Sequence, residues 1–145
     1  MPVSGFSSIG DRLTAALLAG DFHLYREVID LPLTIVPTGE SPYVLLDETA
    51  LRRDFLLYHS VLKLHGVTDI FREVRNVIEE GAGVYRIVWR VHMMVRANRI
   101  AEPFQSEMLI RQRDDQWRIL EIRSLAAHID WALGGTGSGQ DFLKR

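Results

Sequence analysis

The sequence contains no cysteine, and this absence excludes several kinds of site. Disulfide bonds, zinc-thiolate centres, iron-sulfur clusters and thiol catalysis all require that residue. Long apolar runs are also missing, since no stretch approaches the roughly 20 residues of a membrane-spanning helix. The opening residues, MPVSGFSSIGDR, lack the basic and apolar regions of a signal peptide. We therefore expect a cytoplasmic protein with no membrane partner.

A strong charge imbalance is absent too. The 17 Lys and Arg residues nearly balance the 19 Asp and Glu residues, which gives a formal net charge of −2 and no electrostatic reason to expect a nucleic acid partner. The GGTGSG segment at 134–139 lacks the following Lys-Ser/Thr and helix of a phosphate loop. His128 and Asp130 have no third ligand at a metal-binding spacing. We expect neither a cofactor nor a metal.

Residues 83–99, GVYRIVWRVHMMVRANR, carry the clearest pattern in the chain. Apolar and basic side chains alternate there, which is typical of a strand with one buried and one polar face. We expect the odd-numbered residues from Tyr85 to Val95 to be buried, and Arg86, Arg90 and Arg96 to lie on the outer face.

The rest of the chain predicts helices before this strand and further strands around it. Apolar residues at helical spacing predict helices at about 9–19, 21–29 and 47–65. Segments 31–36 and 43–46 flank a turn rich in Pro and Gly and predict a short hairpin. Patterns of period two then predict a four-stranded antiparallel meander between residues 68 and 126. We expect a single domain over residues 1–133 and a flexible tail over residues 134–145.

This order of elements, with three particular segments, resembles the NTF2-like superfamily and, within it, the SnoaL-like and ketosteroid-isomerase-like proteins. The segments are RLTAALLAGD at 12–21, the passage from Tyr25 to Pro37, and IRQRDDQWRILEIR at 110–123. The resemblance covers about residues 9–130. It implies an α+β fold, the cystatin-like cone, in which three N-terminal helices pack on a strongly curved antiparallel sheet around an apolar cavity.

The resemblance also bears on activity. Ketosteroid isomerases use a Tyr on the first helix as an oxyanion donor and an Asp after the first strand as a base. The positions that resemble these are Leu13 and Val36, and neither side chain can transfer a proton. The sequence therefore does not predict a standard ketosteroid isomerase. We expect a protein that binds a small apolar molecule, such as a carbonyl compound, in the cone. The alternatives are an isomerase, cyclase or dehydratase that uses a cavity carboxylate or His, and an accessory subunit without catalysis.

Alternation relative to Trp89 predicts which polar groups face the cavity. Glu107 is the candidate base, because a carboxylate on an apolar face has its pKa raised by desolvation. The competing interpretation is a structural ion pair of Glu107 with Arg72 or Arg111. His59 is the second catalytic candidate, since it lies near the middle of the long helix. The residues expected to contact the ligand are Tyr25, Tyr58, Arg72, Asn76, Trp89, Met93 and Arg111.

The outer face of the sheet is expected to form a contact between two copies of the chain. Arg86, Arg90, His92 and Arg96 form a basic row there, which acidic residues on neighbouring strands can offset. Aromatic residues for stacking nucleic acid bases are missing from this row. A homodimer is the better interpretation, because apolar residues are expected to share this face with the charges: Val84, Val88, Met94, Met108 and Ile110.

Overall fold

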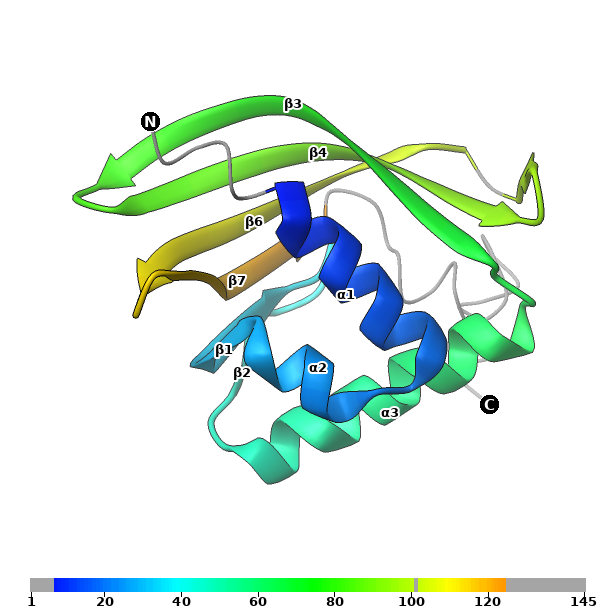
Figure 1. The fold of residues 1–145 in the computed structure, drawn as a ribbon, viewed down its shortest axis with the longest axis horizontal. Coiled ribbons are helices and arrows are strands. Elements are labelled where there is room, and N and C mark those ends of the chain that lie inside the picture. Colours follow the sequence, from blue (N-terminus) through cyan, green and yellow to red (C-terminus); the bar gives the residue numbers. More distant parts are fainter. Residues whose placement is uncertain (1–6, 101, 125–145) are drawn as a thin grey trace.

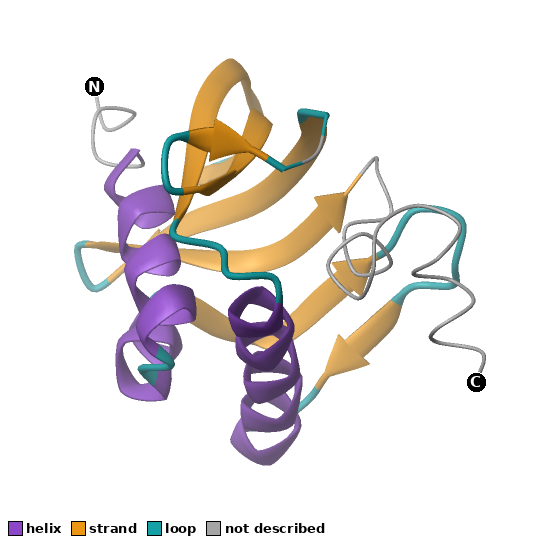
Figure 2. Ribbon diagram, turned by 90° about the vertical axis from the view of Figure 1, so that its right-hand side faces the viewer, coloured by secondary structure: helices purple, strands orange, loops and turns teal. Residues whose placement is uncertain are grey.

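A curved sheet packs on three helices in the computed structural model, which describes residues 7–100 and 102–124 (Figures 1 and 2). The helices are α1 (Ser7–Ala19), α2 (Phe22–Glu27) and α3 (Glu48–Leu64). The strands are β1 (Ile29–Val36), β2 (Tyr43–Leu45), β3 (Asp69–Gly81), β4 (Val84–Val95), β5 (Asn98–Arg99), β6 (Phe104–Arg113) and β7 (Gln116–Ser124).

The helix boundaries follow from capping residues. Gly20, with φ +71°, ends α1 in a left-handed conformation that favours glycine. The Asp21 side chain then accepts a hydrogen bond from the Leu24 amide and begins α2. Asp47 does the same for the Ala50 amide at the start of α3. These residues set where α1 ends and where α2 and α3 begin. All three helices lie on one side of the sheet (Figure 2).

The sheet contains seven strands in the order β2-β1-β7-β6-β4-β3, with β5 paired to β4. The β1-β2 hairpin and the meander through β3, β4, β6 and β7 agree with the sequence patterns. Within the part of the chain that the structure describes, β1 pairs with β7 in parallel and the other pairings are antiparallel, so the sheet is mixed. The predicted α+β fold class, with three helices on a strongly curved sheet, is confirmed.

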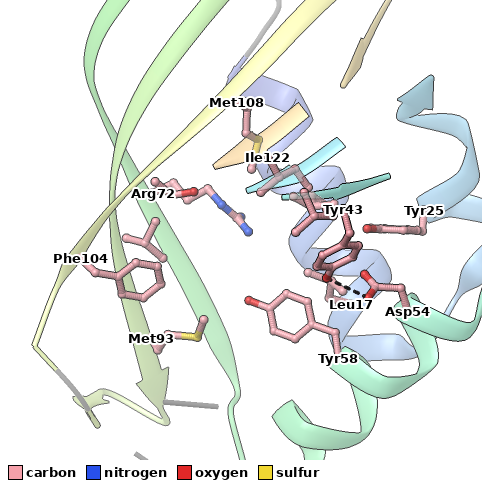
Figure 3. Close-up of a pocket in the computed structure, with 14 residues that line it drawn as sticks. Leu17, Tyr25, Tyr43, Asp54, Tyr58, Arg72, Met93, Phe104, Met108 and Ile122 are labelled. Carbon is pink, nitrogen blue, oxygen red and sulfur yellow. Dashed lines mark hydrogen bonds between the residues drawn. The ribbon is translucent and has the colours of Figure 1, made fainter. Parts of the chain in front are cut away.

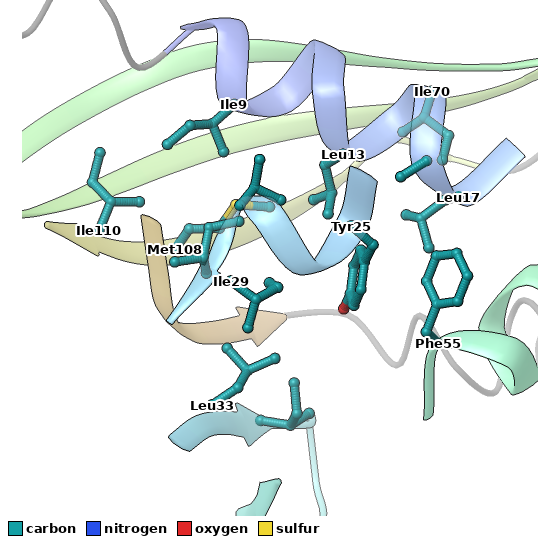
Figure 4. Packing of buried hydrophobic residues seen from close by; sticks show 14 of the residues in the cluster. Ile9, Leu13, Leu17, Tyr25, Ile29, Leu33, Phe55, Ile70, Met108 and Ile110 are labelled. Atoms are coloured by element: carbon teal, nitrogen blue, oxygen red, sulfur yellow. The ribbon is translucent and has the colours of Figure 1, made fainter. Parts of the chain in front are cut away.

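The register predicted for β4 is confirmed from Tyr85 to Met93, whereas Val95, also predicted to be buried, is only partly buried. Trp89 is 2% exposed and Ile87 is fully buried, whereas Arg90 and Arg96 are exposed. The inward side chains of β4 join those of α1, α2 and β1 in one apolar core, part of which is drawn in Figure 4. The sheet therefore has a concave apolar face, against which the helices pack, and a convex outer face.

Two residues predicted on the outer face are in the core instead. Met108 is 3% exposed and Ile110 is fully buried. The reason is the register between β4 and β6: Trp89 pairs with Ser106, so the even-numbered residues of β6 share the inward face of Trp89. Of the predicted outer-face residues, Val84, Val88 and Met94 remain partly exposed there.

The predicted domain boundary at residue 133 and the predicted tail at 134–145 lie outside the described residues. Among the residues that are described, no helix is long and apolar enough to cross a membrane.

Candidate functional site

A pocket lies between the concave face of the sheet and the helices (Figure 3). The pocket is small, with a cavity volume of about 50 Å³. Side chains from every element except β5 line it: Leu13, Leu17, Tyr25, Ile35, Tyr43, Asp54, Tyr58, Arg72, Val91, Met93, Phe104, Ser106, Met108 and Ile122.

Asp54 of α3 is the carboxylate of this pocket. Its Oδ1 accepts a hydrogen bond of 3.3 Å from the hydroxyl of Tyr43, which lies on β2 (Figure 3). Burial raises the pKa of Asp54, and the hydrogen bond from Tyr43 partly opposes that shift. The pocket thus holds a carboxyl group that takes up a proton more readily than an aspartate in water.

Arg72 of β3 is the cation of the pocket, and its guanidinium points into the space that Figure 3 shows. Its Nη1 donates to the Gly10 carbonyl at 3.0 Å and to the Thr14 hydroxyl at 2.6 Å. Thr14 in turn donates to the carbonyl of Ile70 at 3.3 Å. Burial lowers the pKa of Arg72, although an arginine keeps its charge at any ordinary pH. Helix α1 therefore holds this charge in place through neutral acceptors.

Two further tyrosines bring hydroxyl groups to the same space. Burial raises the pKa of Tyr58 to about 12, with the positive charge of Arg72 acting against the shift and the charge of Asp54 adding to it. Burial also raises the pKa of Tyr25, and the charge of Asp54 adds to that shift. Both hydroxyls are neutral near pH 7 and can donate hydrogen bonds.

Several residues predicted to contact a ligand come together here. Tyr25, Tyr58, Arg72 and Met93 all line the pocket. Leu13 lines it too, so an apolar side chain stands at the position that resembles the isomerases' Tyr. A role for these residues in ligand binding stays a prediction.

The prediction that Glu107 faces the cavity is wrong. Glu107 pairs with Val88 across the β6-β4 ladder and shares its outward face. Its carboxylate lies 3.4 Å from Nη1 of Arg86. The guanidinium of Arg86 also contacts the carboxylates of Glu80 and Glu121. Glu107 therefore belongs to an ion-pair network on the outer face. The carboxylate that lines the pocket is that of Asp54.

Arg111 and Asn76 also lie away from the pocket. Arg111 shares the outward face of Glu107 and, with Arg113, binds the buried carboxylate of Asp30. On β3 the register shifts between Val74 and Asn76, and this β-bulge turns Asn76 outward into solvent. Simple alternation along the strand could not predict that turn.

Trp89 and His59 pack in the core and between helices. Trp89 lies beneath α1 and is not among the residues that line the pocket. His59 stacks on Phe55 and donates from Nδ1 to the Leu17 carbonyl at 2.6 Å, near the end of α1. Successive residues of a helix point about 100° apart, so His59 faces α1 where Tyr58 faces the pocket. His59 therefore does not line this pocket, and its predicted catalytic role stays a prediction.

Asp54 and Tyr43 are the polar groups that the sequence interpretation missed. Asp54 lies three residues after Leu51 and four before Tyr58, which places it on the same face of α3. That spacing was the available signal. No sequence pattern marks Tyr43 as a pocket residue, because its contact with Asp54 depends on how β2 packs against α3.

Within residues 7–100 and 102–124, no group of three His, Asp or Glu side chains could hold a metal ion.

The fold of the chain is similar to the folds of several proteins of known structure. A protein of unknown function from Shewanella oneidensis MR-1, described as NTF-2 like, has a TM-score of 0.60 and 15% identity over 86% of this chain and 98% of its own. A proposed dehydratase of the NTF2-like family from Streptomyces avermitilis has a TM-score of 0.59 and 11% identity, covering 86% and 96%. A ketosteroid isomerase-like protein from Erwinia carotovora atroseptica has a TM-score of 0.54 and 17% identity, covering 81% and 88%.

Sequence comparisons add no narrower assignment. No family model matches the chain, and no curated protein matches it. The similarity lies in the structure and covers most of each chain. The chain has the NTF2-like fold.

Proposed function

We propose that this protein binds a small, mostly apolar molecule in the pocket, with the polar end of that molecule at Arg72. The observation that carries the proposal is the contrast between the apolar walls and the few polar groups that converge on one space from α2, α3, β2 and β3. Sites for small molecules commonly combine a largely apolar lining with a few such groups. The enclosed volume favours a compact ligand, or a longer one that extends through the open mouth.

A binding screen tests this proposal. Small hydrophobic ketones, lactones and acids are measured by calorimetry against the wild type and against Ile122→Phe, in which the added ring fills part of the pocket. The matched control is Val88→Phe, which adds the same ring on the outer face. We expect ligands that bind the wild type and the control, and that lose affinity for the Ile122 variant. Equal binding to all three proteins would place the ligand elsewhere.

Acid-base catalysis at Asp54 is the second candidate function. Its raised pKa favours it, because a carboxylate with a pKa closer to neutrality is a stronger general base. In an enolisation, Asp54 would accept the proton from the carbon next to a carbonyl group, and Tyr58 or Arg72 would stabilise the enolate oxygen. An isomerase, cyclase or dehydratase could each use such a step.

Deuterium exchange separates this candidate from binding alone. A ketone that binds is incubated with the protein in D₂O, and NMR follows the loss of its exchangeable carbon-bound hydrogens. Catalysis predicts faster exchange with the wild type than with Asp54→Asn at equal ligand occupancy. Exchange at the same rate with both proteins would leave a binding protein without this chemistry.

The proposal includes a homodimer formed through the outer face of the sheet. Phe71 and Ile78 of β3 support it, since they are 55% and 42% exposed beside the charged residues of β4. Sedimentation at micromolar concentration is expected to give a dimer that Phe71→Lys dissociates. Leu56→Lys, on an exposed position of α3, is the control that leaves the dimer intact. A monomeric wild type would contradict this part of the proposal.

A further inference from the structure

We infer that the ligand of this pocket carries a carboxylate group, which pairs with Arg72. This inference rests on the proposed function, because it names the chemical class of the molecule bound at that site. It follows from how the positive charge of Arg72 is held.

Within the described residues Arg72 makes no contact ion pair, although the charges of Asp11 and Asp69 lie near enough to stabilise its charged form. Its two hydrogen bonds go to a backbone carbonyl and a hydroxyl. Arg86, another arginine of the sheet with little exposure, contacts the carboxylates of Glu80, Glu107 and Glu121. The arginine on the outer face is thus neutralised by contact ion pairs, whereas the pocket arginine, within the described residues, has only the more distant charges of Asp11 and Asp69 near it.

Desolvation makes an anion favourable at this position. Burial lowers the pKa of Arg72, which means that its charged form is less well solvated than in water. A bound anion restores the lost stabilisation through charge and hydrogen bonds together. Both of these hydrogen bonds use Nη1, so the Nε and Nη2 donors of the planar guanidinium remain for a ligand. Two parallel donors match the two oxygens of a carboxylate.

The rest of the pocket favours a single negative charge. Asp54 shares the pocket with Arg72, and its negative charge would repel a dianion such as a phosphate ester. The walls beyond the polar groups are apolar and come from Leu17, Val91, Met93, Phe104, Met108 and Ile122. Met93 and Met108 have flexible, polarisable side chains that can adapt to the shape of a ligand. These features together fit a short aliphatic or aromatic monocarboxylic acid.

Thr14 is the positioning residue for this interaction. It accepts from Nη1 of Arg72 at 2.6 Å while donating to the carbonyl of Ile70, so it fixes the guanidinium between α1 and β3. Thr14→Val removes the acceptor and keeps the shape, whereas Thr14→Ser keeps the hydroxyl. A role in positioning Arg72 predicts that the Val variant loses affinity for acids only and that the Ser variant retains it.

The test compares acids with neutral molecules of the same shape. Butanoate, hexanoate and benzoate are titrated against their primary amides and against 2-hexanone by calorimetry at neutral pH. The proteins are the wild type, Arg72→Gln, Arg72→Lys and the two Thr14 variants. Arg75→Gln, an exposed arginine of the same strand, is the control. We expect the wild type and the control to bind an acid about 10- to 100-fold more tightly than its amide.

The outcomes separate the inference from the proposed function. Arg72→Gln is expected to bind acids and amides equally, and Arg72→Lys to keep only part of the preference. Amides or ketones that bind the wild type as well as the acids do would overturn the carboxylate inference and leave the pocket proposal intact. If neither class binds at millimolar concentration, both fail. If the Arg72 variants do not fold, the ratio of acid to amide affinity in the wild type and the Thr14 variants still tests the carboxylate inference.

Discussion

Replacing Arg86 by Met tests whether the ion-pair network on the outer face stabilises the fold. Arg86 lies on β4, and its side chain is 16% exposed. It contacts Glu107 and Glu121, which are 16% and 17% exposed, as well as the more open Glu80. Methionine keeps most of the apolar stem and removes the charge, so the carboxylates of Glu107 and Glu121 would be left close together without a cation.

The exposure of these side chains sets the expected loss of stability. Removing one partner of a fully buried pair costs about 3 to 5 kcal/mol, whereas an exposed pair is worth about 0 to 1 kcal/mol. The Arg86 network lies between these limits, nearer the buried one, so we expect a loss of roughly 2 to 3 kcal/mol. For a chain of this length that corresponds to a fall in Tm of about 8 to 12 °C.

Urea unfolding measures the effect, with Arg90→Met as the matched control. Arg90 lies on the same strand and is exposed, so its replacement is expected to change the free energy of unfolding by less than about 0.5 kcal/mol. Glu107→Gln should cost less than Arg86→Met and should leave ligand binding unchanged, because Glu107 lies outside the pocket. Combining Glu107→Gln with Arg86→Met should give a loss smaller than the sum of the two single losses. Equal stability of the Arg86 and Arg90 variants would refute the reasoning.

Two further predictions concern stability. Asp54→Asn should stabilise the protein near pH 7, because a carboxyl whose pKa is raised on folding opposes folding in its charged form. This gain in the free energy of unfolding should vanish below about pH 4, where Asp54 is protonated in the unfolded chain as well as in the folded one. A pH series of unfolding free energies checks this, and a gain that persists at low pH would contradict it. Gly20→Ala should cost more than Gly39→Ala, since both glycines have positive φ but only at Gly20 would the new Cβ lie 2.7 Å from Nε2 of His59. The left-handed conformation alone costs about 1 to 2 kcal/mol. Any further loss of stability that comes from the contact of the new Cβ with His59 should shrink when His59→Ala is combined with Gly20→Ala.

The fold could be predicted from the sequence because its signals are local and repeated. Asp21 and Asp47 act as helix caps within three residues of the amides they bind. The alternation along β4 extends over enough residues for one buried face to stand out, and Trp89 marks that face. The parallel pairing of β1 with β7 joins segments far apart in the chain. No local pattern specifies such a contact, since it depends on how the helices carry β1 across the sheet.

The faces of the neighbouring strands were harder to predict than that of β4. A β-bulge on β3 reverses the alternation after Val74, which sends Asn76 outward and leaves Arg72 inward. Between β4 and β6 the chain forms the short strand β5, so the register is not fixed by a tight turn. A shift of one residue exchanges the faces of a whole strand. This is why Glu107 and Arg111 were assigned to the cavity when Ser106, Met108 and Ile110 face inward.

The contrast between the two faces of the sheet is the strongest reason to expect function in the pocket. On the outer face, Arg86 and Glu107 satisfy each other in a network that needs no ligand. In the pocket, Arg72 and Asp54 are both desolvated, yet the two do not pair. Apolar residues of similar volume would stabilise such a cavity more than two separated charges do. Groups that lower stability in this way are typical of sites where a ligand supplies a further partner, and a ligand carboxylate is the contact partner that we infer for Arg72.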